Sequence, residues 1–594
     1  MRVIAAVVLS LSFAALPAMA NSPAKDTAKE DAPATASTSV TTPAQPKEAA
    51  SPAPAAIESQ LEDLRSLLQS QTQELEAQRA ALRAQQLKME ALEEALRSKS
   101  TSPAASAPAE SVAAIAPASS RSSAVISAAA SPVAAASAEP APDPQGTAAE
   151  SPLQLRIGTA YLIPIGFMDF TGVFRSRDGG SGIGTNFAST PIGVNTGIQP
   201  FQPHLSEFRF SMQNSRIGFR VDALVKGAHV IGYMESDFLG NNPGNVAVSS
   251  NSNTLRSRLY WVDVAKDKWE VLGGQTWSLI TPGRTGISPL PGNLFFTQNI
   301  DVNYQLGLVW GRIPEARFVY HPTSKAAFAV ALDSPEQYAG GSAGGSTIIY
   351  PAALNAGTAA LAGNQINTGA STLGTPNIAP DVIAKLAFDP VSKFHLELGG
   401  VERQFKVFNA NPSSLTTFTK TGGGGFVNLN FELVKGFRVL TNNFWSDGGG
   451  RYIFGQAPDL IIRNDGSISP IKSGSTVSGF EFTHGNTMLY AYYGGMYVQR
   501  NATFDTNGTT PIGYGFTGAP IANNQNRSVQ EETLGFNQTL WRDGRYGALN
   551  LMGQYSYMHR NPWFIPAGVD KVAHMNMVFV NLRYTLPGSA PAIK

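Results

Sequence analysis

The residues of this sequence best suited to chemistry are arginines and carboxylates that alternate with apolar residues. In the stretch SRIGFRVD, Arg216 and Arg220 alternate with Ile217 and Phe219. Successive side chains of a β-strand point to opposite faces, so the arginines would share one face and the apolar residues the other. A guanidinium group binds a carboxylate or a phosphate through two parallel hydrogen bonds. The pattern therefore predicts a polar strand face that can bind anions.

The same alternation assigns charged residues of five expected strands to one polar face. In the segment 254–265 it places Leu255, Leu259 and Trp261 on the apolar face and Tyr260 on the polar face. The residues predicted to line a polar interior are Arg216, Arg220, Asp222, Tyr233, Glu235, Asp237, Arg256, Arg258, Glu315, Arg317, His395, Glu397 and Arg403. A register shift of one residue would exchange the inward and outward side chains of the strand in which it occurs. The carboxylates can also pair with the arginines, so the sign of the net field stays open.

Catalysis, metal binding and nucleic-acid binding have little support in the composition. The chain has no cysteine and a formal net charge of +1, and its seven histidines are scattered without metal-ligand spacing. It also lacks a glycine-rich phosphate loop. We therefore expect no catalytic residue, no metal site, no cofactor and no nucleic-acid partner, and hence a protein that is not an enzyme.

The elements that would position these residues are strands joined alternately by short turns and long loops, from residue 153 to residue 594. Such regular alternation is typical of a transmembrane β-barrel, whereas a soluble β-sandwich would show turn signals every 8–12 residues. We predict an all-β barrel of about 16 antiparallel strands, with 18 as the alternative. The strands are expected near residues 155–175, 206–224, 228–238, 254–265, 268–276, 312–321, 326–333, 381–388, 393–404, 424–433, 437–446, 475–484, 486–497, 530–540, 546–557 and 574–586.

The N-terminal region carries a different set of signals. Residues 1–20 have a positive start, an apolar run and the small-residue site Ala18-Met19-Ala20, which predicts a cleaved signal peptide. Residues 21–56 are rich in Ala, Pro and Ser, and we expect them to be disordered. A similar Ala/Pro/Ser linker is expected at 98–152. Export and a strand-built domain together predict an outer-membrane location.

Residues 57–97 have the heptad pattern of a coiled coil. Leucines at 61, 68, 75, 82 and 96 form one layer type, and the other includes three polar layers, at Gln71, Gln78 and Gln85. Polar layers weaken a seam but can fix register and strand number. A single amphipathic helix is the alternative, and the pattern leaves two or three strands open. We expect the coiled coil to lie in the periplasm, because an even strand number returns both barrel ends to the same side.

Four motifs in order resemble those of the DcaP-like outer-membrane porins. They are SRIGFR (215–220), GGQTWS (273–278), RIPEARFVY (312–320) and FAVALDSPE (328–336). The resemblance implies a homotrimer of sixteen-stranded barrels behind a periplasmic coiled coil, and diffusion of small anionic solutes, dicarboxylates among them. Two features depart from the pattern. Glu315-Ala316 stands where a glutamine and an aliphatic residue are expected, and ten residues follow Tyr584.

The third long loop, residues 277–311, is a candidate constriction of the barrel. It carries Arg284 and Asp301, and by fold analogy we expect it to fold inward, with an ordinary outer loop as the alternative. We thus predict an outer-membrane porin for small hydrophilic, anionic solutes, in contact with membrane lipid and with peptidoglycan as a further candidate partner. The alternative is a structural tether that binds the cell wall through its N-terminal region.

Overall fold

The computed structural model describes residues 153–588 except 181, 195–196, 198, 243–249, 251–252, 291–299, 341–346, 355–364, 368–374, 410–414, 455 and 517–524. The predicted signal peptide, the 21–56 segment, the coiled coil with its three glutamines and the 98–152 linker lie outside the described residues. Within the described part, no helix is both long enough and apolar enough to cross a membrane.

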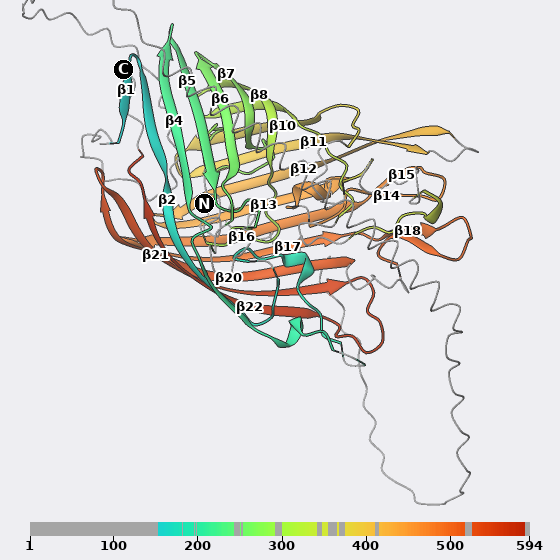
Figure 1. The fold of residues 1–594 in the computed structure, drawn as a ribbon. Helices are drawn as coiled ribbons and strands as arrows, with labels where there is room; N and C mark the ends of the chain where they lie inside the picture. Colours follow the sequence, from blue (N-terminus) through green and yellow to red (C-terminus); the bar gives the residue numbers. More distant parts are fainter. Residues whose placement is uncertain are drawn as a thin grey trace, which may run out of the picture. The chain divides into compact units, whose positions relative to one another are not determined.

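The described chain forms a closed antiparallel barrel of sixteen strands (Figure 1). Two printed strands, β3 and β4, are the two parts of one barrel strand interrupted at residues 212–215. The barrel strands are β2 (Ala160–Arg175), β3 (Glu207–Ser211) with β4 (Arg216–Val225), β5 (Ala228–Asp237), β6 (Arg256–Lys266), β7 (Trp269–Trp277), β8 (Arg312–Thr323), β9 (Ala326–Asp333), β10 (Asp381–Val391), β11 (Phe394–Asn409), β12 (Thr416–Val434), β13 (Phe437–Asp447), β16 (Lys472–His484), β17 (Thr487–Val498), β20 (Asn526–Asp543), β21 (Gly547–Pro562) and β22 (Ala573–Thr585). Each overlaps a strand predicted from the sequence, so the predicted count is confirmed.

Smaller elements lie beside the barrel strands and in the loops. They are β1 (Leu155–Ile157), the hairpins β14 (Leu460–Ile462) with β15 (Ile468–Pro470) and β18 (Asn501–Phe504) with β19 (Pro511–Tyr514), and the short 3-10 helices η1 (Phe187–Ser189), η2 (Gln202–His204), η4 (Ala352–Leu354) and η6 (Gly450–Tyr452). The first predicted strand, 155–175, is therefore a hairpin rather than one strand. Gly158 turns it with φ +62, a conformation that glycine adopts without steric cost.

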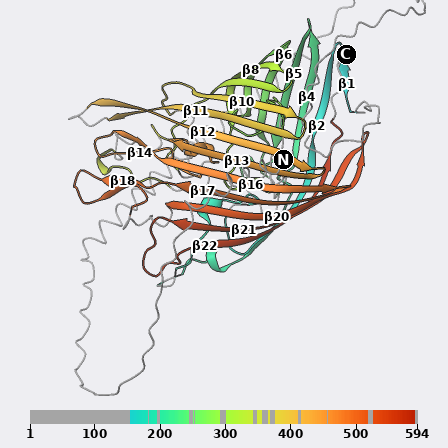
Figure 2. The same cartoon turned by 180° about the vertical axis from the view of Figure 1, so that it is seen from behind.

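Pairing between the first and last long strands closes the barrel. One edge of β2 pairs with β22, from Phe167↔Thr585 to Arg175↔Met577, and its other edge pairs with β3 and β4. Figures 1 and 2 show β2 beside β22 on one side and beside β4 on the other. A single closed sheet has no free long edge. The alternative of a soluble sandwich of two sheets is therefore wrong.

Connections alternate strictly between tight turns and long loops. Seven short turns join the strand pairs at one end, and eight longer segments join them at the other. The turn between β4 and β5 has positive φ at Lys226 (50°) and Gly227 (79°), which matches the twist of a tight hairpin. The predicted Asp389-Pro390 turn lies inside β10 instead, and the chain turns after a register shift between Phe388 and Val391.

The outer wall of the barrel is apolar. Its exposed large apolar side chains come from strands all around the sheet, among them Phe170, Ile217, Phe219, Val271, Phe318, Leu386, Leu398, Val427, Phe480, Leu534, Val578, Val580 and Leu582. Inward neighbours on the same strands are polar or packed against loops. An apolar outside around a polar inside inverts the order of a soluble protein and is that of a membrane β-barrel.

Strand β6 departs from simple alternation near its middle. The β5–β6 register skips a residue between Glu235↔Leu259 and Ser236↔Ser257, which leaves Arg258 as the extra residue of a β-bulge. Arg258 and Leu259 consequently both point inward, and the parity reverses beyond them. The predicted orientations of Leu259 and Trp261 (0% and 4% exposed) and of Tyr260 (40% exposed) are therefore wrong.

Candidate functional site: the loop-filled lumen

The lumen holds the charged residues that the sequence assigned to the polar face. Arg220, Arg258, Arg317, Arg403, Glu235, Asp237 and Glu315 are buried, and Arg216 and Arg256 are partly exposed. They come from strands β4 to β6, β8 and β11. The structure divides these residues among several groups around the wall rather than arranging them as one ladder.

Most of the predicted lumen arginines are neutralised by a carboxylate. Arg317 is paired with Glu315 on the same face of β8. Arg403 lies between Asp381 of β10, 3.0 Å away, and Asp459 of the loop after β13, 2.7 Å away. A buried ion pair with matched partners adds little net field to its surroundings. Arg403 therefore joins the wall to the loop after β13, whereas Arg317 is paired within β8.

One group of arginines is not balanced. Arg216, Arg256, Arg258 and Arg312 gather beside two carboxylates, those of Glu235 and Asp237. Arg258 is paired with Glu235, and Arg256 lies 2.8 Å from Asp237. Among the residues that the structure describes, Arg312 forms no ion pair. Four guanidinium groups and two carboxylates leave an excess of two positive charges, and we call this group the arginine cluster.

Aromatic rings form one wall of the arginine cluster. The guanidinium of Arg312 lies 5.5 Å from the ring centre of Trp277 and 5.0 Å from that of Trp310, which are favourable cation–π distances. Tyr304 packs against both indoles, with ring centres 5.7 Å and 4.8 Å away. Its hydroxyl accepts hydrogen bonds from Arg258 at 2.8 Å and from Arg312 at 3.0 Å.

The arginine cluster makes Tyr304 unusually acidic. Burial by itself would raise the pKa of the phenol, but the positive charges of Arg258, Arg312 and Arg216 outweigh it and lower the pKa to about 8. Opposite charges nearby favour the ionised form of any acid. Tyr304 therefore titrates close to physiological pH and can change the net charge of the cluster.

Alternation along β8 does not predict Arg312 as a lumen residue. It begins β8, and strict alternation from Arg317 would place it on the outer face with Phe318. The loop before β8 instead fixes the backbone next to Arg312, because the Ser278 amide donates a hydrogen bond to the Gly311 carbonyl. Tyr304 and the two indoles come from the same loop region, and no local periodicity marks them.

The loop between β7 and β8, residues 278–311, enters the barrel. Arg284 donates hydrogen bonds from both terminal nitrogens to Glu481 of β16, at 2.9 and 2.5 Å. The Gly283 amide donates to Glu397 of β11 at 3.1 Å. Because these partners are inward residues on strands beyond β9, the loop tip lies across the lumen from its own strands.

Four charged residues of β10 and β11 hold the loop tip. Lys385 lies 3.2 Å from Glu397 and donates a hydrogen bond to the carbonyl of Thr281 at 2.7 Å. His395 bridges Asp389, 2.9 Å away, and Glu397, 3.3 Å away. The Gly286 amide completes the contact through Asp389 at 2.9 Å. Alternation predicted the inward positions of His395 and Glu397, but only the structure shows what they bind.

The second candidate residue of this loop, Asp301, lies apart from Arg284. Its carboxylate accepts hydrogen bonds from the backbone amides of Thr185 at 3.2 Å and Asn303 at 2.8 Å. Burial raises the pKa of Asp301 despite the charge of Arg175. Nearby, the Leu306 amide donates to Glu531 of β20 at 2.9 Å. Asp301 thus ties two loops together inside the barrel and does not face Arg284 across a gap.

The described residues contain no group of three or more His, Cys, Asp or Glu side chains placed to hold a metal ion. The sequence-based expectations of no catalytic site and no cofactor stay predictions. The chemistry that the lumen itself offers is electrostatic, since it presents fixed charges and hydrogen-bond donors inside the barrel.

No protein-family model and no curated protein matches the chain. Among solved structures it is similar to the outer-membrane channel DcaP of Acinetobacter baumannii, with 16% identity and a TM-score of 0.49 over 72% of this chain and 97% of that one. An anion-selective porin from Comamonas acidovorans matches with 11% identity and a TM-score of 0.39, over 72% and 99%. OmpT of Vibrio cholerae matches with 10% identity and a TM-score of 0.37, over 73% and 99%.

These similarities concern the fold, and they include the DcaP channel whose family the four sequence motifs resemble. The closed barrel of sixteen strands, its apolar outer wall and its polar lumen define the chain as a membrane β-barrel.

Proposed function

We propose that the chain is an outer-membrane porin that lets small hydrophilic solutes diffuse through its lumen and favours anions. The observation that carries the proposal is the arginine cluster, where four guanidinium groups accompany two carboxylates inside the barrel. Fixed charges in a narrow aqueous path select permeating ions by sign. Because the other lumen arginines predicted from the sequence, Arg220, Arg317 and Arg403, are paired with carboxylates, selectivity would depend mainly on this one group.

The inward loop supports a channel that is narrowed inside the barrel rather than a wide, open one. The described residues of this loop, 278–290 and 300–311, contact β10, β11, β16 and β20 and would so reduce the cross-section available to a solute. The loop also supplies Tyr304 and ends beside Arg312, so the narrowed region and the positive charge coincide. A carboxylate passing there would meet Arg312 as a partner whose charge no described carboxylate neutralises. Dicarboxylate-like solutes are the class that the family resemblance suggests.

The barrel ends support the proposed topology. β1 and the end of β22 at Thr585 lie at the short-turn end of the barrel. In our proposal this end faces the periplasm, where residues 57–97 form a coiled coil that joins three copies, with polar layers at Gln71, Gln78 and Gln85. The long loops then face outward.

A planar bilayer experiment tests the function. The folded protein is reconstituted under a KCl gradient, and we expect conductance that closes in three steps and a reversal potential that favours chloride. A reversal potential that favours potassium would leave a porin but refute the anion preference. No conductance from a correctly folded barrel would favour the second candidate, a cell-wall tether. Deleting residues 21–150 distinguishes that candidate, because a tether would lose envelope attachment whereas a porin would keep its conductance.

A further inference from the structure

The seven short turns of the barrel carry an excess of positive charge. Between the printed strand ends they comprise residues 226–227, 267–268, 324–325, 392–393, 435–436, 485–486 and 544–546. Six of the seven turns contain one Lys or Arg, and the one acidic residue among them is Asp267. The six basic residues are all exposed, and we call them the basic rim. They are Lys226, Lys268, Lys325, Lys393, Lys435 and Arg545.

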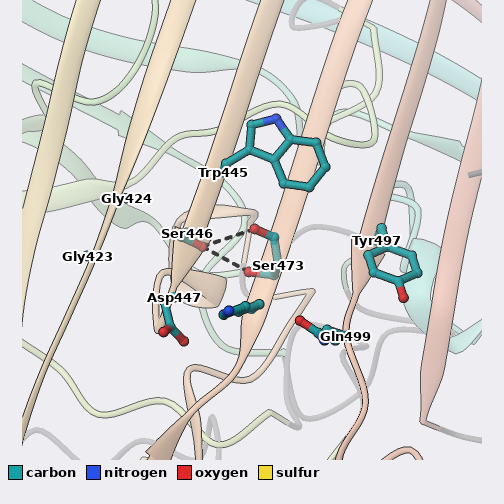
Figure 3. Close-up of a pocket in the computed structure, with 9 residues that line it drawn as sticks. Gly423, Gly424, Trp445, Ser446, Asp447, Ser473, Tyr497 and Gln499 are labelled. Atoms are coloured by element: carbon teal, nitrogen blue, oxygen red, sulfur yellow. Dashed lines mark hydrogen bonds between the residues drawn. The ribbon is translucent and has the colours of Figure 1, made fainter. Parts of the chain in front are cut away.

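The long-loop end of the barrel has no such excess. The eight long segments that join the barrel strands contain six basic and seven acidic residues in total. Opposite charges also face each other at the strand ends beside these loops. Figure 3 shows Asp447 at the end of β13, and in the strand register this residue lies directly opposite Lys472 of β16. The positive excess therefore belongs to the short-turn end alone.

No carboxylate neutralises the basic rim. Among the residues that the structure describes, none of the six forms an ion pair, and Lys268 donates a hydrogen bond to the carbonyl of Pro322 at 3.2 Å. Neighbouring turns are two strands apart, or about 10 Å across the sheet, which is about one screening length at 0.1 M salt. The rim charges therefore repel one another, and an anionic partner would stabilise them.

Aromatic side chains place the basic rim at the membrane surface. Trp269 begins β7 directly after a short turn, and its ring centre lies 4.3 Å from that of Tyr320 and 5.1 Å from that of Phe318. Trp541 and Tyr546 are exposed beside the last short turn. Trp and Tyr gather at the depth where acyl chains meet headgroups. The basic rim lies just beyond them and hence at the depth of the lipid phosphates.

We propose that the basic rim binds a shell of anionic phospholipid through the lipid phosphates. A cell-wall strand or another protein would contact one side of the rim, whereas a lipid leaflet surrounds the barrel and meets all the turns that carry a basic residue. Phosphate oxygens accept charge-assisted hydrogen bonds from Lys and Arg. The proposal depends neither on the arginine cluster nor on conductance. In the topology proposed above, the shell belongs to the periplasmic leaflet.

Electron spin resonance of the full-length protein in phosphatidylcholine vesicles tests the proposal. A trace of spin-labelled phosphatidylglycerol or spin-labelled phosphatidylcholine is added, and the fraction immobilised by the barrel gives the relative association. One basic residue at the membrane surface favours an anionic lipid about fivefold. Because lipids of one leaflet alone reach the rim, we expect an average preference of about threefold at about 0.02 M salt. At about 1 M salt, where the screening length is about 3 Å, it should nearly vanish.

Three sets of substitutions separate the basic rim from the rest of the surface. The first removes the charge from three alternate turns and should lower the preference to about twofold, since half of the rim is lost. It combines Lys226→Gln, Lys325→Gln and Lys435→Gln. The second changes the same three residues to arginine, which keeps the charge and should keep the preference. The third is the matched control, which removes three exposed basic residues of the long loops and should change nothing. It combines Arg463→Gln, Arg500→Gln and Lys571→Gln.

Four results would overturn the proposal. Equal association of the two lipids at low salt would show that the rim does not bind anionic lipid. A full preference in the glutamine variant of the turns, or a lost preference in the variant of the long loops, would place the binding elsewhere. Sedimentation with purified cell-wall sacculi examines the other partner. Sedimentation that the glutamine variant of the turns loses, together with an unchanged lipid preference, would assign the rim to the cell wall.

Discussion

Removing the charge of Arg312 tests the origin of ion selectivity. Arg312→Gln lowers the excess of the arginine cluster from two positive charges to one, and the glutamine can still donate a hydrogen bond to Tyr304. At about 7 Å in a water-like medium, one charge changes the energy of a monovalent ion by about 0.6 kcal/mol, close to RT. The local anion concentration should therefore fall about threefold and the cation concentration rise about threefold. Together these changes lower the chloride-to-potassium permeability ratio about sevenfold or more.

The assay is the reversal potential of single reconstituted channels under a KCl gradient. It should be run at about 0.1 M salt, where the screening length is about 10 Å, and repeated at about 1 M, where it shrinks to about 3 Å. The shift should be large in the first condition and small in the second. Arg312→Lys keeps the charge and should keep the selectivity. Arg545→Gln, on an exposed turn, controls for a general effect of lost charge. A permeability ratio unchanged by Arg312→Gln at low salt would refute the reasoning.

Three further predictions concern the loop, the pH response and the N-terminal region. Glu481→Gln removes the forked contact with Arg284 and should lower the free energy of unfolding by about 1–3 kcal/mol, with noisier single-channel current; a quiet, fully stable variant would contradict this. Raising the pH from about 7 to 9 ionises Tyr304, whose pKa is about 8, and lowers the net positive charge of the arginine cluster by one. The anion preference measured from reversal potentials should therefore weaken, and Tyr304→Phe should abolish this pH dependence. Replacing Gln71, Gln78 and Gln85, the polar layers of the predicted coiled coil, with leucine should keep the barrel but give mixed oligomers on cross-linking. Uniform trimers would show that these layers do not set the number of strands in the coiled coil.

The barrel was predictable from the sequence because its signals are local. Period-two alternation gives each strand, and turn residues such as Lys226-Gly227 give each hairpin. Parity correctly separates inward Glu235 from outward Phe219 without any knowledge of the fold. Sixteen such local signals add up to the closed sheet.

What the sequence could not predict depends on contacts between distant residues. The bulge at Arg258 reverses the parity of β6, and no residue pattern near it signals that change. The pairing of Arg403 with Asp459 joins a strand to a loop that only the closed barrel brings together. Arg312 lies in the cluster because the preceding loop turns inward. The net charge of the lumen therefore follows from the tertiary arrangement and could not be obtained by counting arginines.

The contacts of the inward loop also bear on the order in which the protein assembles. Arg284 and Glu481 are 197 residues apart in the chain, and Leu306 and Glu531 are 225 residues apart. Contacts of such long range form late, because the intervening chain must first be ordered. The loop lies in the first half of the barrel sequence. The residues that hold it, Glu481 and Glu531, lie on β16 and β20, which are among the last strands. The loop therefore takes its final position inside the barrel only when the wall is nearly complete.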